Sequence, residues 1–316
     1  MTANAPHSQD KLIVILGPTA TGKTKLAIRI AKELRTSIIS GDSMLVYRGL
    51  DIGSAKPDEA ERGGVRHALV DCLDPADESF NAADFQRLAA EEIHAVNQSG
   101  TIPILAGGTG LYVKALLEGY RFNKNQEDGE YRASLERLAE KHGKAYIHKM
   151  LEEVDPEAAA RLHVNDFRRV VRALEVWRLG QERISQDKQE DGLAYDACVI
   201  GLCSDRKILY ERIEKRVDAM ISAGLEEEVR RLLAGGVARS ARAMQGIGYK
   251  EMVAYINGEL SLAEAVANIK KATRHFAKRQ FTWYRKMPYI HWFDIDAIPF
   301  EELVETVLET INNKFI

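Results

Sequence analysis

An eight-residue segment near the start of the chain has the composition of a phosphate-binding loop. It matches the pattern GxxxxGK[ST] and consists of Gly17, Pro18, Thr19, Ala20, Thr21, Gly22, Lys23 and Thr24. The glycines let backbone N–H groups close around phosphate oxygens, and the N-terminus of the following helix adds partial positive charge. Lys23 offers a charge for terminal phosphates, and Thr24 a hydroxyl for Mg²⁺. The motif predicts a bound di- or triphosphate but leaves open phosphoryl transfer, nucleotide hydrolysis or departure of a pyrophosphate.

Two further polar residues follow short apolar runs that read as strands. Asp42, followed by Ser43, comes after residues 37–40, and Thr109 comes after residues 102–106 in the sequence AGGTG. Because the carboxyl ends of neighbouring parallel strands meet at one crevice, Asp42 and Thr109 are expected to face the phosphate loop. A carboxylate there can take a proton from a nucleophile or order metal-bound water. The alternative is that Asp42 is a helix N-cap.

The elements that position these residues alternate between strand and helix. Strands are predicted at residues 11–16, 37–40, 68–70, 102–106, 197–202 and 289–294. Helices are predicted at 25–34, 81–97, 165–180 (with Asn165 as N-cap), 206–234, 249–256 and 262–286. This alternation indicates an α/β fold, a P-loop NTPase-like parallel sheet flanked by helices. Residues 123–195 lack strand patterns and predict an all-helical insertion domain, so the core comprises residues 1–122 and 196–316.

Composition narrows the class of protein. The 316 residues are 45% hydrophobic and 29% charged, which is typical of a globular protein. The formal net charge of −3 disfavours a protein that coats nucleic acid indiscriminately. There is no apolar run long enough to span a membrane, and the polar first ten residues predict a loose tail without signal-peptide character. Three cysteines without metal or disulfide spacing suit a reducing cytosol, so we expect the protein to be cytoplasmic. We also expect it to be an enzyme and a monomer.

A basic stretch near the C-terminus predicts contact with phosphates. Residues 265–292 contain no acidic side chain. At helical spacing one half of this stretch carries Lys270, Lys271, Arg274, Lys278, Arg279, Arg285 and Lys286, and the other half carries Ile269, Phe276, Trp283 and Tyr284. The basic half is a candidate RNA surface, although a merely solvated face is the alternative. Phe281 is either a stacking platform for a base or an aromatic at the edge of the core.

Several long segments resemble one family. The segments GPTATGKT, SGDSMLVYRGLDIGSAKP, ILAGGTGLYVKALLEG, NDFRRVVRALEV, QGIGYKE and RHFAKRQFTWYRK occur in this order. They resemble successive signatures of the tRNA dimethylallyltransferase (tRNA isopentenyltransferase) family, and the resemblance extends from residue 17 to about residue 294. The segment RFNKNQEDGEYR matches no family signature, and nothing is inferred from it.

The resemblance implies an activity and a set of catalytic residues. Family members transfer a prenyl group from dimethylallyl diphosphate to N6 of the adenosine 3′ of the tRNA anticodon. Residues 17–24 would then hold the diphosphate, which is a leaving group here, together with Mg²⁺ at Thr24. Asp42 would be the general base for the adenine amine, and Thr109 would contact the reaction site. Arg216, which matches a family arginine, would stabilise charge on the departing diphosphate, with Arg212 one turn earlier on the same helix.

The resemblance also implies a tRNA surface. The helical insertion would close over the anticodon stem–loop, and the target adenosine would be flipped into the crevice. The residues expected to contact tRNA are Asp42, Ser43, Met44, Leu45, Thr109, Asp166, Phe167, Arg168, Arg169, Val170, Gln245, Gly246, Ile247, Gly248, Tyr249, Lys250, Arg274 and Lys278. Arg172 belongs to the same basic cluster as Arg168 and Arg169. The alternative for the QGIGYK segment is an ordinary turn before a helix.

Three other functions are compatible with parts of the pattern. A P-loop kinase of a small hydroxylated metabolite would share the phosphate loop and the strand-end Asp42, but not the basic helix. A prenyltransferase of free adenine nucleotides would share the crevice without needing an RNA-binding insertion. An NTP-gated RNA switch would need no catalytic base at Asp42.

Overall fold

The computed structural model describes residues 10–120, 122, 128–180 and 192–315. The chain divides into two compact units, one of Met1–Glu118 with Leu193–Ile316 and one of Gly119–Gly192. These boundaries lie a few residues from those expected from the sequence. Most of the expected N-terminal tail (1–9) and parts of the expected insertion (123–127 and 181–191) lie outside the described residues.

A parallel sheet forms the centre of the first unit. Its strands within the described ranges are β1 (Lys11–Leu16), β2 (Ile38–Ser40), β3 (His67–Ala68), β4 (Ile104–Gly107), β5 (Asp196–Cys203) and β6 (Ile290–Asp294). Their order is β3-β2-β4-β1-β5-β6, and every pair is parallel. The strands that carry the predicted site, β1, β2 and β4, are neighbours. The predicted α/β class is confirmed.

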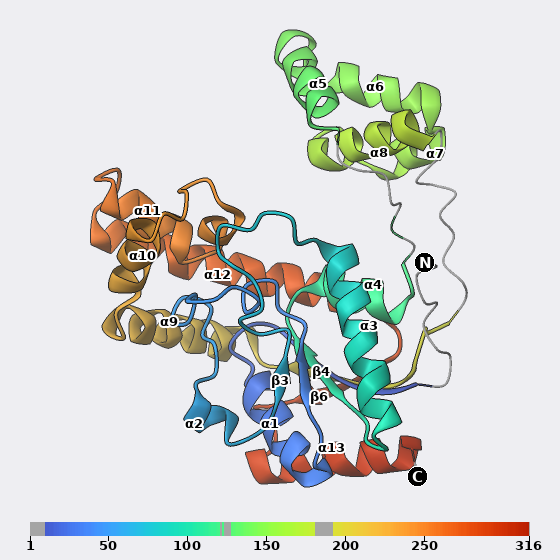
Figure 1. Ribbon diagram of the computed structural model, residues 1–316, viewed down its shortest axis with the longest axis vertical. Helices are drawn as coiled ribbons and strands as arrows, with labels where there is room; N and C mark the ends of the chain where they lie inside the picture. The colour runs from blue at the N-terminus through green and yellow to red at the C-terminus, as the bar shows by residue number, and fades with distance from the viewer. Residues whose placement is uncertain (1–9, 121, 123–127, 181–191, 316) are drawn as a thin grey trace. The chain divides into compact units, whose positions relative to one another are not determined.

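Helices cover both faces of this sheet, as Figure 1 shows. They are α1 (Lys23–Leu34), α2 (Glu59–Arg62), α3 (Ala82–Gln98), α4 (Gly110–Leu117), α9 (Arg206–Ser222), α10 (Leu225–Ala234), the 3₁₀ turn η2 (Arg242–Gln245), α11 (Tyr249–Ile256), α12 (Leu262–Tyr284) and α13 (Phe300–Phe315). The pleat of β1 sends Ile13 and Ile15 into a core with α1 and α13. Leu12 and Val14 enter the opposite core with α3, α4 and α10–α12.

One predicted helix is in fact two. Residues 206–234 were expected to be continuous, but α9 ends at Ser222 and α10 begins at Leu225. Gly224 between them has φ of 96°, a left-handed conformation that glycine adopts without strain. After the break, Leu225 and Val229 of α10 join the core that holds Leu12 and Val14, and α9 packs beside α12.

The second unit is helical throughout its described residues. Its helices are α5 (Gly129–His142), α6 (Lys144–Val154), α7 (Pro156–Arg161) and α8 (Phe167–Gly180). Leu135, Ile147, Leu151 and Leu174 share its separate core. The expected N-cap is off by one residue: α8 begins at Phe167, so the residue that precedes it is Asp166, whose carbonyl accepts the first helical bond from Val170 N–H at 3.1 Å.

Across the described ranges, no helix is both long enough and apolar enough to cross a membrane.

Candidate active site

The phosphate loop connects β1 to α1 and presents a row of unused backbone donors. The Thr21 hydroxyl donates to the Pro18 carbonyl at 2.8 Å and closes the turn. Ala20 has φ of 66° and Gly22 φ of 77°, so both lie in the left-handed region. The N–H groups of residues 20–24 have no partner within the described part of the chain. This is the arrangement that binds phosphate oxygens.

The first residues of the loop have other tasks. A Cβ at Gly17 would lie 2.9 Å from the Leu202 carbonyl oxygen, so only glycine fits beside β5. Thr19 N–H donates to the Gln280 side-chain oxygen at 2.9 Å. Pro18 has no N–H. Of the predicted cradle of residues 17–24, Pro18 and Thr19 therefore offer no free backbone donor to a ligand.

Three charged side chains from separate elements interact beside this loop. Lys23 is partly buried, and its Nζ donates to the Pro18 carbonyl at 3.2 Å. Burial lowers the pKa of Lys23 to about 8; the positive charge of Arg216 acts in the same direction, and the Asp42 carboxylate opposes both. Burial also lowers the pKa of Arg216, although the carboxylates of Asp42 and Glu61 act in the opposite direction and raise it. The two cations are desolvated and lie near the free backbone donors of the loop, so the crevice is suited to an anion.

Arg212, predicted to lie near Arg216, is directed elsewhere. Its guanidinium forms an ion pair with Asp296 at 2.9 Å. Arg216 and Arg212, one turn apart on α9, thus differ in their partners: Arg216 interacts with the phosphate-loop lysine, and Arg212 binds the segment after β6.

Asp42 sits in a tight turn immediately after β2. Its Oδ1 accepts from Met44 N–H at 2.8 Å, an Asx turn. No helix begins within residues 41–56 of the described chain, so the alternative that Asp42 caps a helix is wrong. Oδ2 makes no hydrogen bond to the described residues, which leaves this oxygen available to a substrate.

Thr109 joins the turn after β2 to the loop after β4. Its hydroxyl accepts from Ser43 N–H at 3.0 Å and donates to Ser43 Oγ at 3.3 Å. Its N–H donates to the Gly41 carbonyl at 3.2 Å. A Cβ at Gly107 would lie 2.5 Å from Gly41 Cα, so the two loops touch through glycine backbones. Three predicted strand ends therefore converge as expected.

Gln280 and Tyr284 of α12 were missed by sequence reasoning. Both donate to the Gly108 carbonyl, Gln280 Nε2 at 2.7 Å and the Tyr284 hydroxyl at 2.9 Å. Gln280 is 4% exposed although basic residues surround it in the sequence. A signal was present: Gln280 stands four residues after Phe276 and four before Tyr284, which is the inward phase of the helix.

The basic half of α12 is partly neutralised by its neighbour α9. Arg274 pairs with Glu214 and Lys270 with Asp218, each at 2.6 Å. The expectation of uncompensated charge is therefore wrong for these two residues, because the acids come from another helix. Lys278, in contrast, is exposed.

The aromatic residues of α12 also depart from expectation. Trp283 was expected to point inward but is 40% exposed, and it packs over Gly110. Phe281 lies against Trp292 with ring centroids 5.4 Å apart, and Arg285 covers its ring at 4.5 Å. Phe281 thus fits the edge-of-core alternative.

Two predicted tRNA segments of the first unit pack together. A Cβ at Gly246 would lie 2.4 Å from Met44 Cε, so segment 245–250 rests on the turn after Asp42. Gln245 and Lys250 are exposed, whereas Leu45 and Ile247 are partly buried and Gly248, which precedes α11, is buried. The QGIGYK segment does contain a turn that opens a helix.

Tyr249 has an internal role that the sequence did not reveal. Its side chain is fully buried, and its hydroxyl donates to Glu228 at 2.8 Å. Glu228 also accepts from the N–H groups of Asp51, Ile52 and Gly53 at 3.0, 2.8 and 3.1 Å. Burial raises the pKa of the Tyr249 hydroxyl, and Glu228 adds to the shift. The predicted tRNA contact at Tyr249 therefore cannot involve its side chain in this conformation.

The predicted cluster on α8 divides into exposed and internal residues. Arg168 and Arg169 are exposed, and Arg169 pairs with Asp166 at 2.7 Å. Val170 is 1% exposed in the core of the helical unit, so its side chain is not on the surface. Phe167 packs on the same core.

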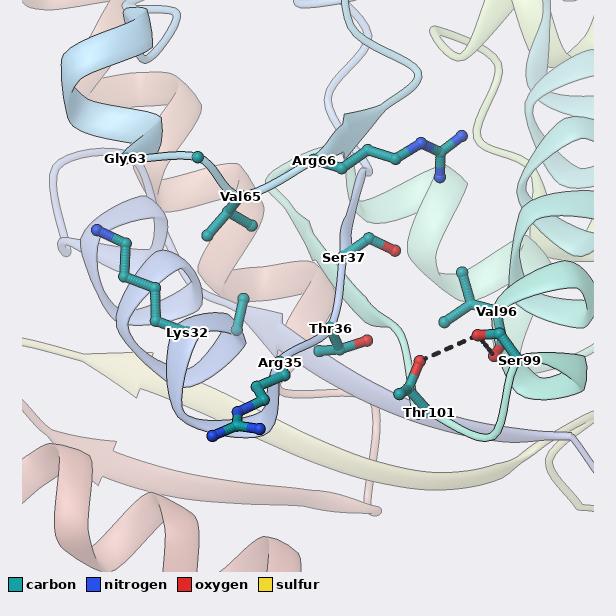
Figure 2. A pocket seen from close by; sticks show the side chains of 12 residues that line it. Lys32, Arg35, Thr36, Ser37, Gly63, Val65, Arg66, Val96, Ser99 and Thr101 are labelled. Atoms are coloured by element: carbon teal, nitrogen blue, oxygen red, sulfur yellow. Dashed lines mark hydrogen bonds between the residues drawn. The ribbon is translucent and has the colours of Figure 1, made fainter.

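A separate surface pocket lies at the opposite, amino ends of the strands (Figure 2). Lys32 and Arg35 point away from the hydroxyls of Thr36 and Ser37 in this view. Arg66 is held by Glu92 through bonds of 2.8 and 3.0 Å. The cations of this pocket, Lys32, Arg35 and Arg66, do not point towards one another in Figure 2. None of the predicted site residues lines this pocket.

Fold and site together define an α/β protein whose phosphate loop, strand-end acid and helix-borne arginine meet at the carboxyl edge of a parallel sheet. A family model described as IPP transferase matches residues 45–287. The chain is 47% identical over 289 residues to the tRNA dimethylallyltransferase of Bacillus cytotoxicus, covering 91% of each. It therefore belongs to the IPP transferase family.

Solved structures agree with this family assignment. The tRNA isopentenylpyrophosphate transferase of Bacillus halodurans matches with a TM-score of 0.73 at 42% identity, covering 96% of each chain. A eukaryotic dimethylallyltransferase described as acting on tRNA matches with a TM-score of 0.75 at 28% identity, covering 90% of this chain and 74% of the other.

Proposed function

We propose that this chain transfers a dimethylallyl group from dimethylallyl diphosphate to N6 of the adenosine on the 3′ side of the tRNA anticodon, position 37, and releases diphosphate. The observation that carries the proposal is that the phosphate loop, with free N–H groups at residues 20–24, and the turn that holds Asp42 lie at the carboxyl ends of one run of neighbouring strands, β2, β4 and β1. The electrostatic coupling of Lys23 with Arg216 and Asp42 supports it. Membership of the IPP transferase family supplies the reaction class. An anion site with an adjacent base is what an alkyl transfer with a diphosphate leaving group requires.

The donor end of the crevice binds and stabilises the diphosphate. The free N–H groups of residues 20–24 and the ammonium of Lys23 surround its oxygens. As the bond between the allylic carbon and oxygen breaks, the electron pair moves onto the diphosphate. In this proposal Arg216 and Lys23 supply preorganised positive charge where the negative charge develops, so little reorganisation is needed.

Asp42 acts on the acceptor. The exocyclic amine of adenine is a weak nucleophile because its lone pair is conjugated with the ring. Asp42 takes one proton from N6 as the new N–C bond forms, a contribution of about 10²- to 10⁴-fold for a positioned general base. Thr109 and Ser43 fix the turn that holds this carboxylate.

Magnesium fits the residues present. Thr24 is exposed at the first turn of α1, beside the free loop donors. Nowhere in the described chain do three or more His, Cys, Asp or Glu side chains gather as a self-sufficient metal site. Mg²⁺ commonly binds through one or two protein oxygens completed by phosphates and water, so Thr24 would hold it together with the diphosphate. The ion would neutralise part of the diphosphate charge.

Exposed basic residues on both units would bind the tRNA backbone. Arg168 and Arg169 lie on α8, Lys278 on α12 and Lys250 on α11. Glu228 and Tyr249 act indirectly in this proposal, because they fix residues 51–53 of the long loop that begins with Asp42.

The proposal is tested by supplying one donor and three acceptors. Purified protein is mixed with Mg²⁺, dimethylallyl diphosphate and an unmodified tRNA with adenosine at positions 36–38. Parallel reactions contain the same tRNA with guanosine at position 37, or free AMP. Digestion and mass spectrometry then detect N6-dimethylallyladenosine.

Product on the first tRNA alone is the expected result. Product on AMP would instead indicate an enzyme of free nucleotides. Absence of product, combined with ATP turnover when small hydroxylated metabolites are added, would indicate a kinase and refute the proposal.

A further inference from the structure

Gln280 uses both ends of its side-chain amide at the centre of the crevice. Its oxygen accepts from Thr19 N–H at 2.9 Å, and its nitrogen donates to the Gly108 carbonyl at 2.7 Å. The side chain is 4% exposed, so these bonds are shielded from water. One residue of α12 therefore connects the phosphate loop after β1 to the loop after β4.

The phosphate loop needs such support at this point. Ala20, the next residue after Thr19, has φ of 66°, which is unfavourable for any residue with a Cβ. Its methyl group packs against Leu209 and Ile213 of α9 and Ala277 of α12. Ala277 and Gln280 are one turn apart on α12, so this helix braces two consecutive residues of the loop.

The chemistry of the position calls for an amide. An acceptor must face Thr19 and a donor must face Gly108. A Cβ placed on Gly108 would lie 2.6 Å from Gln280 Nε2 and 3.7 Å from Lys23 Nζ, so the amide lies close to the phosphate-loop lysine. A carboxylate here would repel the Gly108 carbonyl and compete with the diphosphate for Lys23.

We infer that Gln280 is a positioning residue for the diphosphate. By occupying Thr19 N–H it fixes the first turn of the loop in the conformation that leaves the N–H groups of residues 20–24 free for the ligand. Gln280 itself does not touch the reacting atoms. This inference rests on the proposed function in taking the diphosphate to be the ligand of the loop.

The matched control is Tyr284, which donates to the same Gly108 carbonyl, whereas Thr19 N–H donates to Gln280. Gln280→Met removes both bonds with little change of volume, and Tyr284→Phe removes only the bond to Gly108. Gln280→Asn is a milder variant, because an amide one methylene shorter cannot reach both partners. Melting temperatures identify any variant that fails to fold.

The affinities for Mg²⁺-pyrophosphate and Mg²⁺-dimethylallyl diphosphate are measured by calorimetry without tRNA. We expect Gln280→Met to weaken the binding of both ligands by about 10- to 100-fold, the range for an unpaired buried donor next to a charged ligand. Gln280→Asn should weaken it by a smaller factor, and Tyr284→Phe by less than about 3-fold. In steady state the KM for dimethylallyl diphosphate should rise while the KM for tRNA stays unchanged.

Other outcomes overturn the inference. Equal losses in the Gln280 and Tyr284 variants would mean that only the Gly108 loop matters, and wild-type affinity in folded Gln280 variants would mean that the bond to Thr19 does not position the loop. Wild-type protein that binds pyrophosphate but not dimethylallyl diphosphate would refute the proposed function while the pyrophosphate comparison still decides the role of Gln280. Binding of neither ligand would refute both.

Discussion

Each unit of the chain holds a group of interacting charges, and the two groups differ in how well they are satisfied. In the crevice, Lys23 and Arg216 share Asp42, and burial lowers the pKa of Lys23 to about 8. In the helical unit, the fully buried Glu175 pairs with Arg132 at 2.8 Å and with Arg172. In the first group burial disfavours the charged state of both cations, whereas in the second the charged state of the acid is favoured.

The pKa of Glu175 reflects its pairing. Burial opposes its ionisation, but hydrogen bonds from Arg132, Arg172 and the Asp128 N–H outweigh burial and hold the pKa of Glu175 below its ordinary value. A charge that all its neighbours satisfy stabilises a fold. Buried cations whose charged state is disfavoured cost stability, and such perturbed groups often mark functional sites.

The largest expected effect follows replacement of Asp42, the acid of the charge group in the crevice. Asn at position 42 keeps an oxygen for Met44 N–H, so the turn should persist. The proton acceptor is lost, and kcat with tRNA should fall by about 10²- to 10⁴-fold. Dimethylallyl diphosphate affinity should change much less. The measurement is single-turnover formation of N6-dimethylallyladenosine with calorimetry of the donor.

A matched control is Asp296→Asn, which alters a carboxylate paired with Arg212 outside the crevice. Its turnover should stay close to wild type. If Asp42→Asn retained more than about a tenth of the wild-type rate, the carboxylate would not be the base.

Sequence patterns predicted the sheet well because its strands are short apolar runs that end at glycine or polar turns. All the strands expected from the sequence are present, and β2 and β4 end beside the loops that were expected to meet. The break at Gly224 was missed because a single glycine in a strong helical pattern does not by itself show that the helix ends there.

The site was predicted only as far as local motifs reach. Lys23, Asp42 and Arg216, each of which follows from a motif or a family signature, are close enough to affect one another's charge, while their catalytic roles stay predictions. Gln280 and Glu228 were missed because their partners are distant in sequence, Thr19 in one case and residues 51–53 in the other. Charge pairing across α9 and α12 was missed for the same reason: counting acids within one helix ignores those of its neighbour.

The next largest effect concerns Glu175, the acid of the charge group in the helical unit. Glu175→Ala should destabilise the helical unit by about 1–3 kcal/mol, because Arg132 and Arg172 lose a buried partner but are exposed enough to turn towards water. Since the fold lowers the pKa of Glu175, this stabilisation exists above the ordinary carboxyl range and disappears as the pH falls through the folded pKa. The readout is hydrogen exchange of residues 129–180 in the whole chain.

Glu175→Ala should leave donor affinity unchanged in calorimetry. Arg137→Ala on α5, outside the Glu175 ion pairs described above, is the control for loss of a charge in the same unit. If Glu175→Ala weakened binding of dimethylallyl diphosphate, the division between a structural and a functional charge group would be wrong.

A smaller effect tests the charge state of Lys23. With a pKa of about 8, Lys23 is partly neutral in the free protein at that pH, and a bound diphosphate should restore its proton. Binding of dimethylallyl diphosphate at pH 8 should therefore take up about half a proton. Calorimetry in buffers of different ionisation enthalpy measures this uptake. Lys23→Met, which binds more weakly, should lack it, and equal uptake in both proteins would assign the proton to the ligand.

The smallest effect distinguishes paired from unpaired basic residues on α12. Lys278 is exposed, whereas Arg274 is already neutralised by Glu214 at 2.6 Å. If Lys278 and Arg274 both face tRNA phosphates, Lys278→Ala should reduce the magnitude of the negative slope of log affinity against log salt concentration by about one unit. The reason is that one phosphate contact fewer releases fewer counter-ions. Arg274→Ala should change the slope less, because Arg274 must first leave Glu214.

The double variant Arg274→Ala with Glu214→Ala should match Arg274→Ala in slope but bind tRNA more tightly, since an unpaired acid near the RNA is removed. Equal slopes for Lys278→Ala and wild type would exclude Lys278 from the tRNA surface and leave the exposed arginines of α8 as the main backbone contacts.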